Sequence, residues 1–194
     1  MFAAGTDTTY TVLEWAMSKL LKHPKTMKKL KNEIRKIKGD HKGCYVNEND
    51  LDKMVYLKAI IKETLRLHPP IPLLIPKESI KPINLRGYDI KPRTRVISNV
   101  APKLWEEAEE FRLERFMNNS IDFKGQDFVL IPFGVGRRGC PGIVFATVIN
   151  EITLANLVHK FDWMVSNGEV LDMTGAFGMT IHRKFPLVAT TTPC

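Results

Sequence analysis

The sequence lacks the cysteine and histidine patterns of a small metal-bound or disulfide-bonded domain. Its three cysteines, Cys44, Cys140 and Cys194, are odd in number and far apart, and no Cys-x-x-Cys pair occurs. This pattern argues against a disulfide framework and indicates a reducing compartment. The five histidines are scattered along the chain, so we expect no structural zinc site.

Long apolar runs, internal repeats and nucleotide-binding motifs are also absent from the sequence. No run is long enough to span a bilayer, we expect no signal peptide, and no Gly-x-x-x-x-Gly-Lys-Ser/Thr pattern occurs. With 194 residues and 44% hydrophobic content, the chain has a globular composition, sufficient for one good-sized core or two small ones. The net charge of +8 favours an acidic partner or an anionic surface.

The apolar pattern predicts four long helices. In the first, over residues 3–22, Leu13, Ala16, Met17 and Leu20 recur at the helical spacing, and apolar residues cover nearly every side. Such a helix is expected to be buried. The other three helices are expected over residues 25–38, over residues 55–67, and from Gly142 to about His159.

The remaining segments have the patterns of short strands, turns and irregular structure. The expected elements are short strands over 77–100 with turns at Arg86-Gly87 and Lys91-Pro92, an irregular segment over 117–131, turns at Gly168 and Gly175, and a last strand ending near Ala189. The predicted fold class is therefore mainly α with small antiparallel β-sheets (α+β).

The second predicted helix carries a strongly basic face. Its apolar side is formed by Met27, Leu30, Ile34 and Ile37, and the opposite side carries Lys25, Lys28, Lys29, Lys31, Arg35, Lys36 and Lys38. A solvated surface explains this face, because no aromatic residues are interleaved with the charges. A basic module that binds nucleic acid or a membrane is the alternative.

The most distinctive stretch is the loop over residues 132–142, which reads Pro-Phe-Gly-Val-Gly-Arg-Arg-Gly-Cys-Pro-Gly. We expect it to bring Cys140 to the first turn of the fourth helix, where a helix start and nearby arginines favour the thiolate. Arg137 and Arg138 offer guanidinium groups to a carboxylate or phosphate, and the glycines let a flat group approach. The pattern favours a sulfur-ligated, acid-bearing flat group. A core cysteine and a phosphate cradle are the alternatives.

Five positions of this loop, Phe133-x-x-Gly136-x-Arg138-x-Cys140-x-Gly142, are similar to the haem-binding signature of cytochrome P-450 monooxygenases. Three further motifs occur in the order typical of that family: Ala4-Gly5-x-Asp7-Thr8-Thr9, Glu63-x-x-Arg66 followed by Leu67-His68-Pro69-Pro70, and Phe111-Arg112-Leu113-Glu114-Arg115-Phe116. The chain most resembles plant microsomal members. The resemblance implies the carboxyl-terminal part of their fold, with residues 1–194 as a single partial domain that lacks the amino-terminal anchor and the distal helices.

Two of these motifs have simpler explanations when taken alone. Residues 4–9 fit a helix N-cap, because Thr and Asp side chains accept hydrogen bonds from first-turn amides. Glu63 and Arg66 fit a surface ion pair worth about 0.2–0.5 kcal/mol. The resemblance instead implies an oxygen-activation motif inside a long helix, and a buried charged pair that locks, together with Arg115, the loop behind the cysteine.

The resemblance implies a role for each matching residue. Cys140 would be the thiolate ligand of the iron in haem b (iron protoporphyrin), and Asp7 and Thr8 would deliver protons. Lys77 stands where the family often has arginine, and would help Arg138 to pair the haem propionates. Haem contacts are also expected from Phe133, Gly134, Gly136 and Gly142. Substrate contacts are expected from Ala4, Ile71, Leu73, Leu74, Ile75, Phe177 and Met179. A structural role is expected for Glu63, Arg66 and Arg115.

The implied function is that of a haem-thiolate monooxygenase, which inserts one oxygen atom from O2 into a small apolar organic substrate of plant secondary metabolism. Electrons would come from an NADPH-dependent cytochrome reductase, whose acidic surface would meet basic residues such as Arg137. Full-length relatives associate with the cytosolic face of the endoplasmic reticulum membrane through an anchor absent here, and no nucleic acid is expected as a partner. The alternatives are a truncated, non-catalytic form of such an enzyme and a basic binding module acting through residues 25–38.

One departure from the family pattern falls at Val100–Ala101. Related chains continue there with a Trp-Ala pair and a Gly-Arg-Asp run before Pro102-Lys103-Leu104-Trp105, and those residues are absent from this sequence. The shortening affects the end of the predicted strand and the short helix that follows it.

Overall fold

The computed structural model describes residues 2–39, 44–98, 104–165 and 171–193. The predicted departure at Val100–Ala101 and the turn predicted at Gly168 lie outside these ranges. The helices are α1 (Phe2–Lys22), α2 (Pro24–Lys38), α3 (Glu48–Leu51), α4 (Val55–Leu67), α5 (Glu114–Met117), the 3₁₀ turn η2 (Gly136–Arg138) and α6 (Ile143–Lys160).

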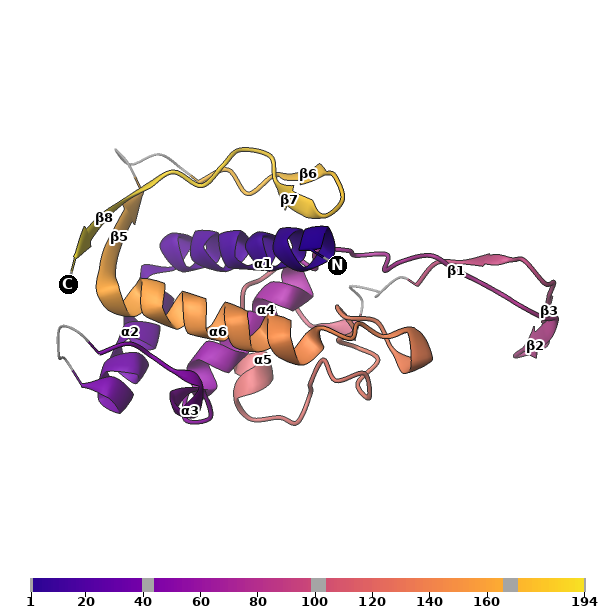
Figure 1. The fold of residues 1–194 in the computed structure, drawn as a ribbon, viewed down its shortest axis with the longest axis horizontal. Coiled ribbons are helices and arrows are strands. Elements are labelled where there is room, and N and C mark those ends of the chain that lie inside the picture. The colour runs from indigo at the N-terminus through magenta and orange to yellow at the C-terminus, as the bar shows by residue number, and fades with distance from the viewer. Residues whose placement is uncertain (1, 40–43, 99–103, 166–170, 194) are drawn as a thin grey trace.

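The four long helices pack around one apolar core. Figure 1 shows α1 and α6 running side by side, with α2 and α4 packed against them. Side chains from all four helices are fully buried, among them Trp15, Leu20, Leu30, Ile34, Leu57, Ile60, Ile61, Leu154 and Val158. The predictions of four long helices and of a buried first helix are therefore confirmed, with bounds within a residue or two of those expected.

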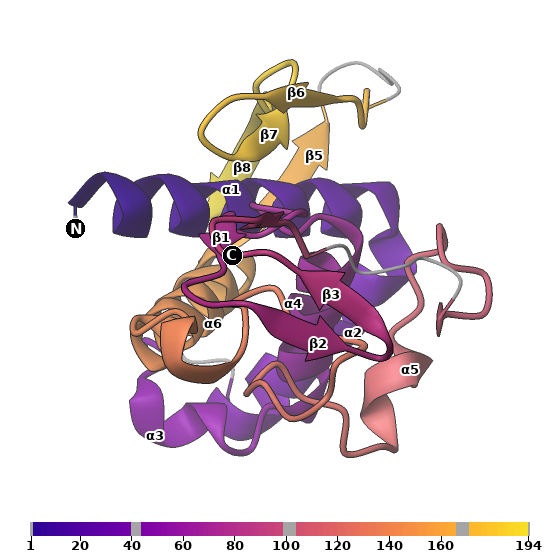
Figure 2. The same ribbon diagram turned by 90° about the vertical axis from the view of Figure 1, so that its right-hand side faces the viewer.

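The N-terminal ends of α1 and α6 position the segments that carry the candidate site residues. Both helices begin on the right in Figure 1. Figure 2 shows α1 crossing the view, with its N-terminal end at the left, on the side where α6 lies. The first turns of α1 and the loop that precedes α6 therefore face a common region.

The described residues also form four small antiparallel sheets of two strands each. The strand pairs are β1 (Lys77–Glu78) with β4 (Arg95–Val96), β2 (Ile83–Leu85) with β3 (Tyr88–Ile90), β5 (Phe161–Val165) with β8 (Ala189–Pro193), and β6 (Gly175–Phe177) with β7 (Ile181–Arg183). The first two pairs form an arm that extends away from the helices, whereas the β6–β7 hairpin lies along α1 (Figure 1). The predicted fold class is thus confirmed.

Two expectations for the C-terminal tail are wrong. Gly175 begins strand β6 instead of a turn, and the last strand starts at Ala189 instead of ending there. Strand β5 was not predicted, although Phe161, Trp163 and Val165 are half-buried and alternate with exposed residues. Its partner β8 begins after 23 intervening residues. The neighbouring sequence therefore gave no indication of the strand with which β5 pairs.

A stacked pair of rings joins α1 to the end of α4. The Trp15 and His68 rings lie 3.9 Å apart between centroids, with an angle of 1° between their planes. Burial, helped by the positive charges of Lys19 and Arg66, lowers the pKa of His68 from 6.5 to about 3. The imidazole is therefore neutral in the folded protein at physiological pH.

The neutral state of His68 makes stability depend on pH. Below pH 6.5 the unfolded chain binds a proton at His68 that the folded protein does not bind until about pH 3. Stability from this residue is therefore complete above pH 6.5 and is lost as the pH falls, at about 1.4 kcal/mol per pH unit. We expect His68→Phe, which keeps a flat ring for stacking, to remove that part of the pH dependence. Urea unfolding at pH 6.5 and pH 4.5 measures the free energy of unfolding of both proteins. An equal change in that free energy between the two pH values for wild type and variant would contradict the prediction.

Candidate active site

The loop over residues 133–142 forms one wall of the candidate site. The amide of Cys140 donates to the Phe133 carbonyl at 2.9 Å, and the amide of Gly139 donates to the Gly136 carbonyl at 3.0 Å. Gly134 and Gly136 have φ angles of 71° and 70°, which glycine adopts without strain. These turns leave Cys140 exposed, with its Sγ atom 3.8 Å from the place a Cβ on Gly142 would occupy.

Cys140 lies just ahead of α6, not in its first turn. The helix starts at Ile143, with Gly142 as its N-cap, and its first hydrogen bond joins the amide of Ala146 to the Gly142 carbonyl. The expected position of the cysteine is therefore off by one turn. The reason is Pro141, because a proline disfavours the helical conformation at the residue before it, here Cys140.

The first half of α1 forms a second wall. Because the helix already runs from Phe2, residues 4–9 do not cap it, and the N-cap interpretation is wrong. The Thr8 hydroxyl donates to the Ala4 carbonyl at 2.7 Å, whereas Asp7 accepts from Thr180 at 2.7 Å. A Cβ built on Gly5 would meet nothing within 4 Å, so open space adjoins this part of α1.

The segment after α4 and the β6–β7 hairpin complete the surroundings. The amide of Ile181 donates to the Pro70 carbonyl at 2.8 Å, and the Trp15 indole donates to the Ile181 carbonyl at 3.0 Å. These bonds hold together the two segments, 71–75 and 177–179, that carry six of the seven residues expected to contact substrate, while Ala4 lies on α1. Four of the seven are exposed apolar side chains, at 50% for Leu73, 73% for Ile75, 93% for Phe177 and 60% for Met179, while Ile71 and Leu74 are half-buried and Ala4 is exposed.

A cavity of about 430 Å³ lies beside the cysteine loop. A Cβ on Gly134 would lie 3.9 Å from Cδ1 of Leu74, so the loop touches the segment that follows α4. The cavity is lined by Ile71, Leu74, Trp105, Pro132 and Ile181 among others, whereas neither Cys140 nor Asp7 belongs to the described residues that line it. Two of its lining residues, His68 and Trp105, have buried ring nitrogens without a described hydrogen-bond partner.

The two cations expected near the propionates are not brought together by any described contact. Lys77 lies in β1 opposite Val96, half-buried. Arg138 is exposed in η2, as is its neighbour Arg137. Phe133 packs edge to face against Phe123, with ring centroids 5.5 Å apart, and this contact anchors the start of the cysteine loop.

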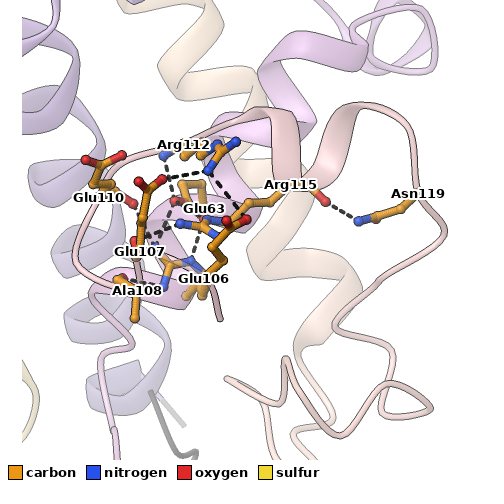
Figure 3. A network of polar contacts seen from close by, with 9 residues as sticks. Glu63, Glu106, Glu107, Ala108, Glu110, Arg112, Arg115 and Asn119 are labelled. Atoms are coloured by element: carbon orange, nitrogen blue, oxygen red, sulfur yellow. Dashed lines mark hydrogen bonds and ion pairs between the residues drawn. The ribbon is translucent and has the colours of Figure 1, made fainter. Parts of the chain in front are cut away.

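A buried charged cluster holds the segment over residues 107–115 (Figure 3). Glu63 is fully buried and binds Arg66 through two hydrogen bonds of 2.6 and 2.9 Å. Arg66 also donates to the carbonyls of Ala108 and Glu110, at 2.7 and 2.9 Å. The Glu63 carboxylate further accepts from the backbone amide of Arg112 at 2.8 Å. The pair is therefore not a surface ion pair.

Arg115 joins this cluster from α5. Its Nε atom lies 3.6 Å from Glu63 Oε1, and its Nη2 atom donates to the Glu107 carbonyl at 2.8 Å. Both Arg66 and Arg115 lie over the ring of Trp105, at 5.4 and 5.9 Å from its centroid. One carboxylate and two guanidinium groups thus fix the path of the chain from residue 107 to residue 115.

Sequence reasoning missed the polar contacts between α1 and the C-terminal hairpin. Thr180 bonds Asp7 and also lies 3.0 Å from the hydroxyl of Thr11, and buried Arg183 donates to Ser18 at 2.8 Å. The paired residues are more than 160 positions apart in the sequence. No local pattern signals such pairs, because each threonine alone fits an ordinary helix or strand position.

The chain is similar to known cytochromes P-450. A sequence model of the cytochrome P-450 family matches residues 1–187. A cytochrome P-450 of Prunus mume is 56% identical, and the alignment covers 100% of this chain and 39% of that protein. The (+)-menthofuran synthase of Mentha piperita is 49% identical, with 100% of this chain and 40% of that protein covered. A zebra fish cytochrome P-450 solved with progesterone has a TM-score of 0.88 at 27% identity, covering 100% of this chain and 44% of that one.

The relatives are longer than this chain. The chain spans about two fifths of the curated relatives that it matches. The alignment with the Prunus mume protein is 201 residues long, whereas this chain has 194, so the relative has at least seven positions that this chain lacks. From the family pattern, we expect the missing positions to lie at Val100–Ala101.

The buried cluster gives a stability prediction. Glu63→Gln leaves the two buried guanidinium groups of Arg66 and Arg115 without their counter-charge, which we expect to lower the free energy of unfolding by about 3–5 kcal/mol. Urea unfolding of the complete protein that carries this chain measures the loss.

The matched control is Glu106→Gln. The Glu106 side chain is 83% exposed and lies 3.8 Å from Arg112, and an exposed pair of this kind contributes about 1 kcal/mol or less. A loss at Glu63 no larger than the loss at Glu106 would contradict the assignment of a structural role to the cluster.

Proposed function

Because the chain belongs to the cytochrome P-450 family, we propose that the protein carrying it is a haem-thiolate monooxygenase, of which residues 1–194 form part of a single catalytic domain. It inserts one oxygen atom from O2 into a small apolar organic substrate. The observation that carries the proposal is the exposed thiol of Cys140, presented by a glycine-turned loop directly before α6.

Membership of the family implies a haem cofactor, and we propose haem b. The residues present fit this group, because Cys140 is exposed and a Cβ on Gly136 would meet nothing within 4 Å. Cys140 is the proposed ligand, with Phe133, Gly134, Gly136 and Gly142 around it and Arg138 and Lys77 for the propionates. When bound, the haem supplies the iron that activates oxygen, and a thiolate ligand favours cleavage of the O–O bond.

The proposed proton path uses Asp7 and Thr8 on α1. The Thr8 hydroxyl donates its hydrogen to the Ala4 carbonyl, so in this arrangement its oxygen can only accept a further hydrogen bond. Asp7 is half-buried and has one carboxylate oxygen bound to Thr180. Asp7 is therefore the residue that can hold a proton near the open space at Gly5.

The exposed apolar side chains support a substrate of low polarity. Leu73, Ile75, Phe177 and Met179 are at least half exposed, and apolar groups gathered on adjoining segments are typical of a binding surface. The proposed substrate contacts also include Ala4, Ile71 and Leu74. Relatives include a (+)-menthofuran synthase and a 3-beta-hydroxylase, in keeping with a small organic substrate of plant secondary metabolism.

The proposed electron donor is an NADPH-dependent cytochrome reductase. The exposed side chain of Arg137, beside the cysteine loop, offers a positive charge to an acidic partner surface. We further propose that the complete protein acts at the cytosolic face of the endoplasmic reticulum membrane. In the part of the chain that the structure describes, no helix is both long and apolar enough to cross a bilayer.

A second candidate function is that of a non-catalytic member of the family. The observation in its favour is the absence of at least seven positions that the Prunus mume relative has. Trp105, close to the predicted gap, lines the cavity with a buried indole nitrogen that has no described partner. Cavities and unpaired buried donors both destabilise a fold, which would weaken the support of the cysteine loop.

Spectroscopy of the complete protein, expressed with a supply of haem, separates these functions. The monooxygenase proposal predicts a red-shifted carbon monoxide difference band for the reduced protein, and Cys140→Ser should lose the band because the thiolate ligand is gone. Cys44→Ser is the matched control and should keep the band, since Cys44 lies in a separate loop. Survival of the band in Cys140→Ser would refute the ligand assignment, and its absence from the wild type would favour the non-catalytic function.

A further inference from the structure

The carboxylate of Asp7 is held by a residue from the opposite end of the chain. The Oγ1 atom of Thr180 donates to Asp7 Oδ2 at 2.7 Å and lies 3.0 Å from Oγ1 of Thr11. Thr180 is 2% exposed and Thr11 is fully buried. The bond between the two hydroxyls is therefore shielded from water, whereas the bond to the half-buried Asp7 carboxylate is partly buried.

The direction of both hydrogen bonds follows from the chemistry of the groups. An ionised carboxylate only accepts hydrogen bonds, and a hydroxyl has one hydrogen to donate. Thr180 gives its hydrogen to Asp7, so the bond between the two hydroxyls must be donated by Thr11. The result is a one-way chain from Thr11 through Thr180 to Asp7, which ends in a charge-assisted bond.

The hairpin that carries Thr180 is fixed directly after this residue. The next residue, Ile181, is bound through its amide to Pro70 and through its carbonyl to Trp15. Gly178, two residues before, lies close to the His182 ring, since a Cβ there would be 2.9 Å from it. The two hydrogen bonds of Ile181 thus fix the backbone directly after Thr180 against α1 and the segment that follows α4.

We propose that Thr180 is the positioning residue for Asp7. It binds Oδ2, while no contact among the described residues engages Oδ1, so the second oxygen stays available for proton transfer. The proposal rests on the proposed function, which places the Asp7 carboxylate on the proton path. It adds a residue that directly follows Met179, so the proposed substrate wall and the support of Asp7 share one turn.

Three variants in the complete protein test this role. Thr180→Val removes the hydroxyl at nearly constant volume, Thr180→Ser keeps it, and Thr190→Val is a matched control, since Thr190 is exposed in β8 and its hydroxyl bonds the Met164 carbonyl. We expect Thr180→Val to lower the fraction of consumed O2 recovered as product about tenfold, which is less than the roughly 10²–10⁴-fold contributed by a positioned general acid, because Asp7 is still present. Thr180→Ser should restore this fraction, and Thr190→Val should leave it unchanged.

A double-variant cycle separates positioning from general structural support. In an Asp7→Asn background, Thr180→Val should have no further effect on the recovered fraction, because the group it positions is gone. The thermal midpoint of unfolding is the second readout. Thr180→Val should lower it, and should lower it by less than half as much in the Asp7→Asn background.

The outcomes distinguish this inference from the function on which it rests. A wild type with the carbon monoxide band, together with an unchanged recovered fraction in Thr180→Val, overturns the role of Thr180 alone. Equal effects of Thr180→Val with and without Asp7 show a merely structural residue and also overturn it. A wild type without the band overturns the proposed monooxygenase function instead.

Discussion

The position of the Cys140 thiol depends on a backbone path that only glycine takes without strain. At positions 134 and 136 the chain turns with positive φ angles, and the amide of Cys140 then closes the loop onto the Phe133 carbonyl. A side chain at either turn would oppose the left-handed conformation. Without that conformation the Cys140 sulfur would not lie exposed ahead of α6. The candidate site formed with α1, the segment after α4 and the β6–β7 hairpin would then lack its thiol.

Contacts from distant parts of the chain fix the segments around this loop. Phe123 packs on Phe133 at its start, and the Glu63–Arg66 pair binds the chain between residues 107 and 115. In addition, α1 lies beside α6 and holds the C-terminal hairpin through Trp15 and Asp7. Buried charges and hydroxyls are costly unless paired, so each of these attachments specifies one geometry instead of merely adding stability.

How much the sequence could predict depended on the range of the interactions. The long helices and the turn at Gly87 follow from local periodicity and local backbone preference. The spacing within residues 133–142 sufficed for the candidate ligand, and the resemblance sufficed for burial of Glu63. The β5–β8 pairing and the Thr180–Asp7 bond were not predictable, because each joins residues distant in the chain. The place of Cys140 one turn ahead of α6 was missed because Pro141 decides it locally, against the apolar pattern of the helix.

The central claim is that the sulfur of Cys140 binds the haem iron. X-ray absorption at the iron edge, recorded on the haem-loaded complete protein, tests it most directly because this method identifies the atoms bound to iron. The account predicts one sulfur neighbour in the wild type and none when position 140 carries serine. An iron bound by nitrogen and oxygen atoms alone in the wild type would contradict it.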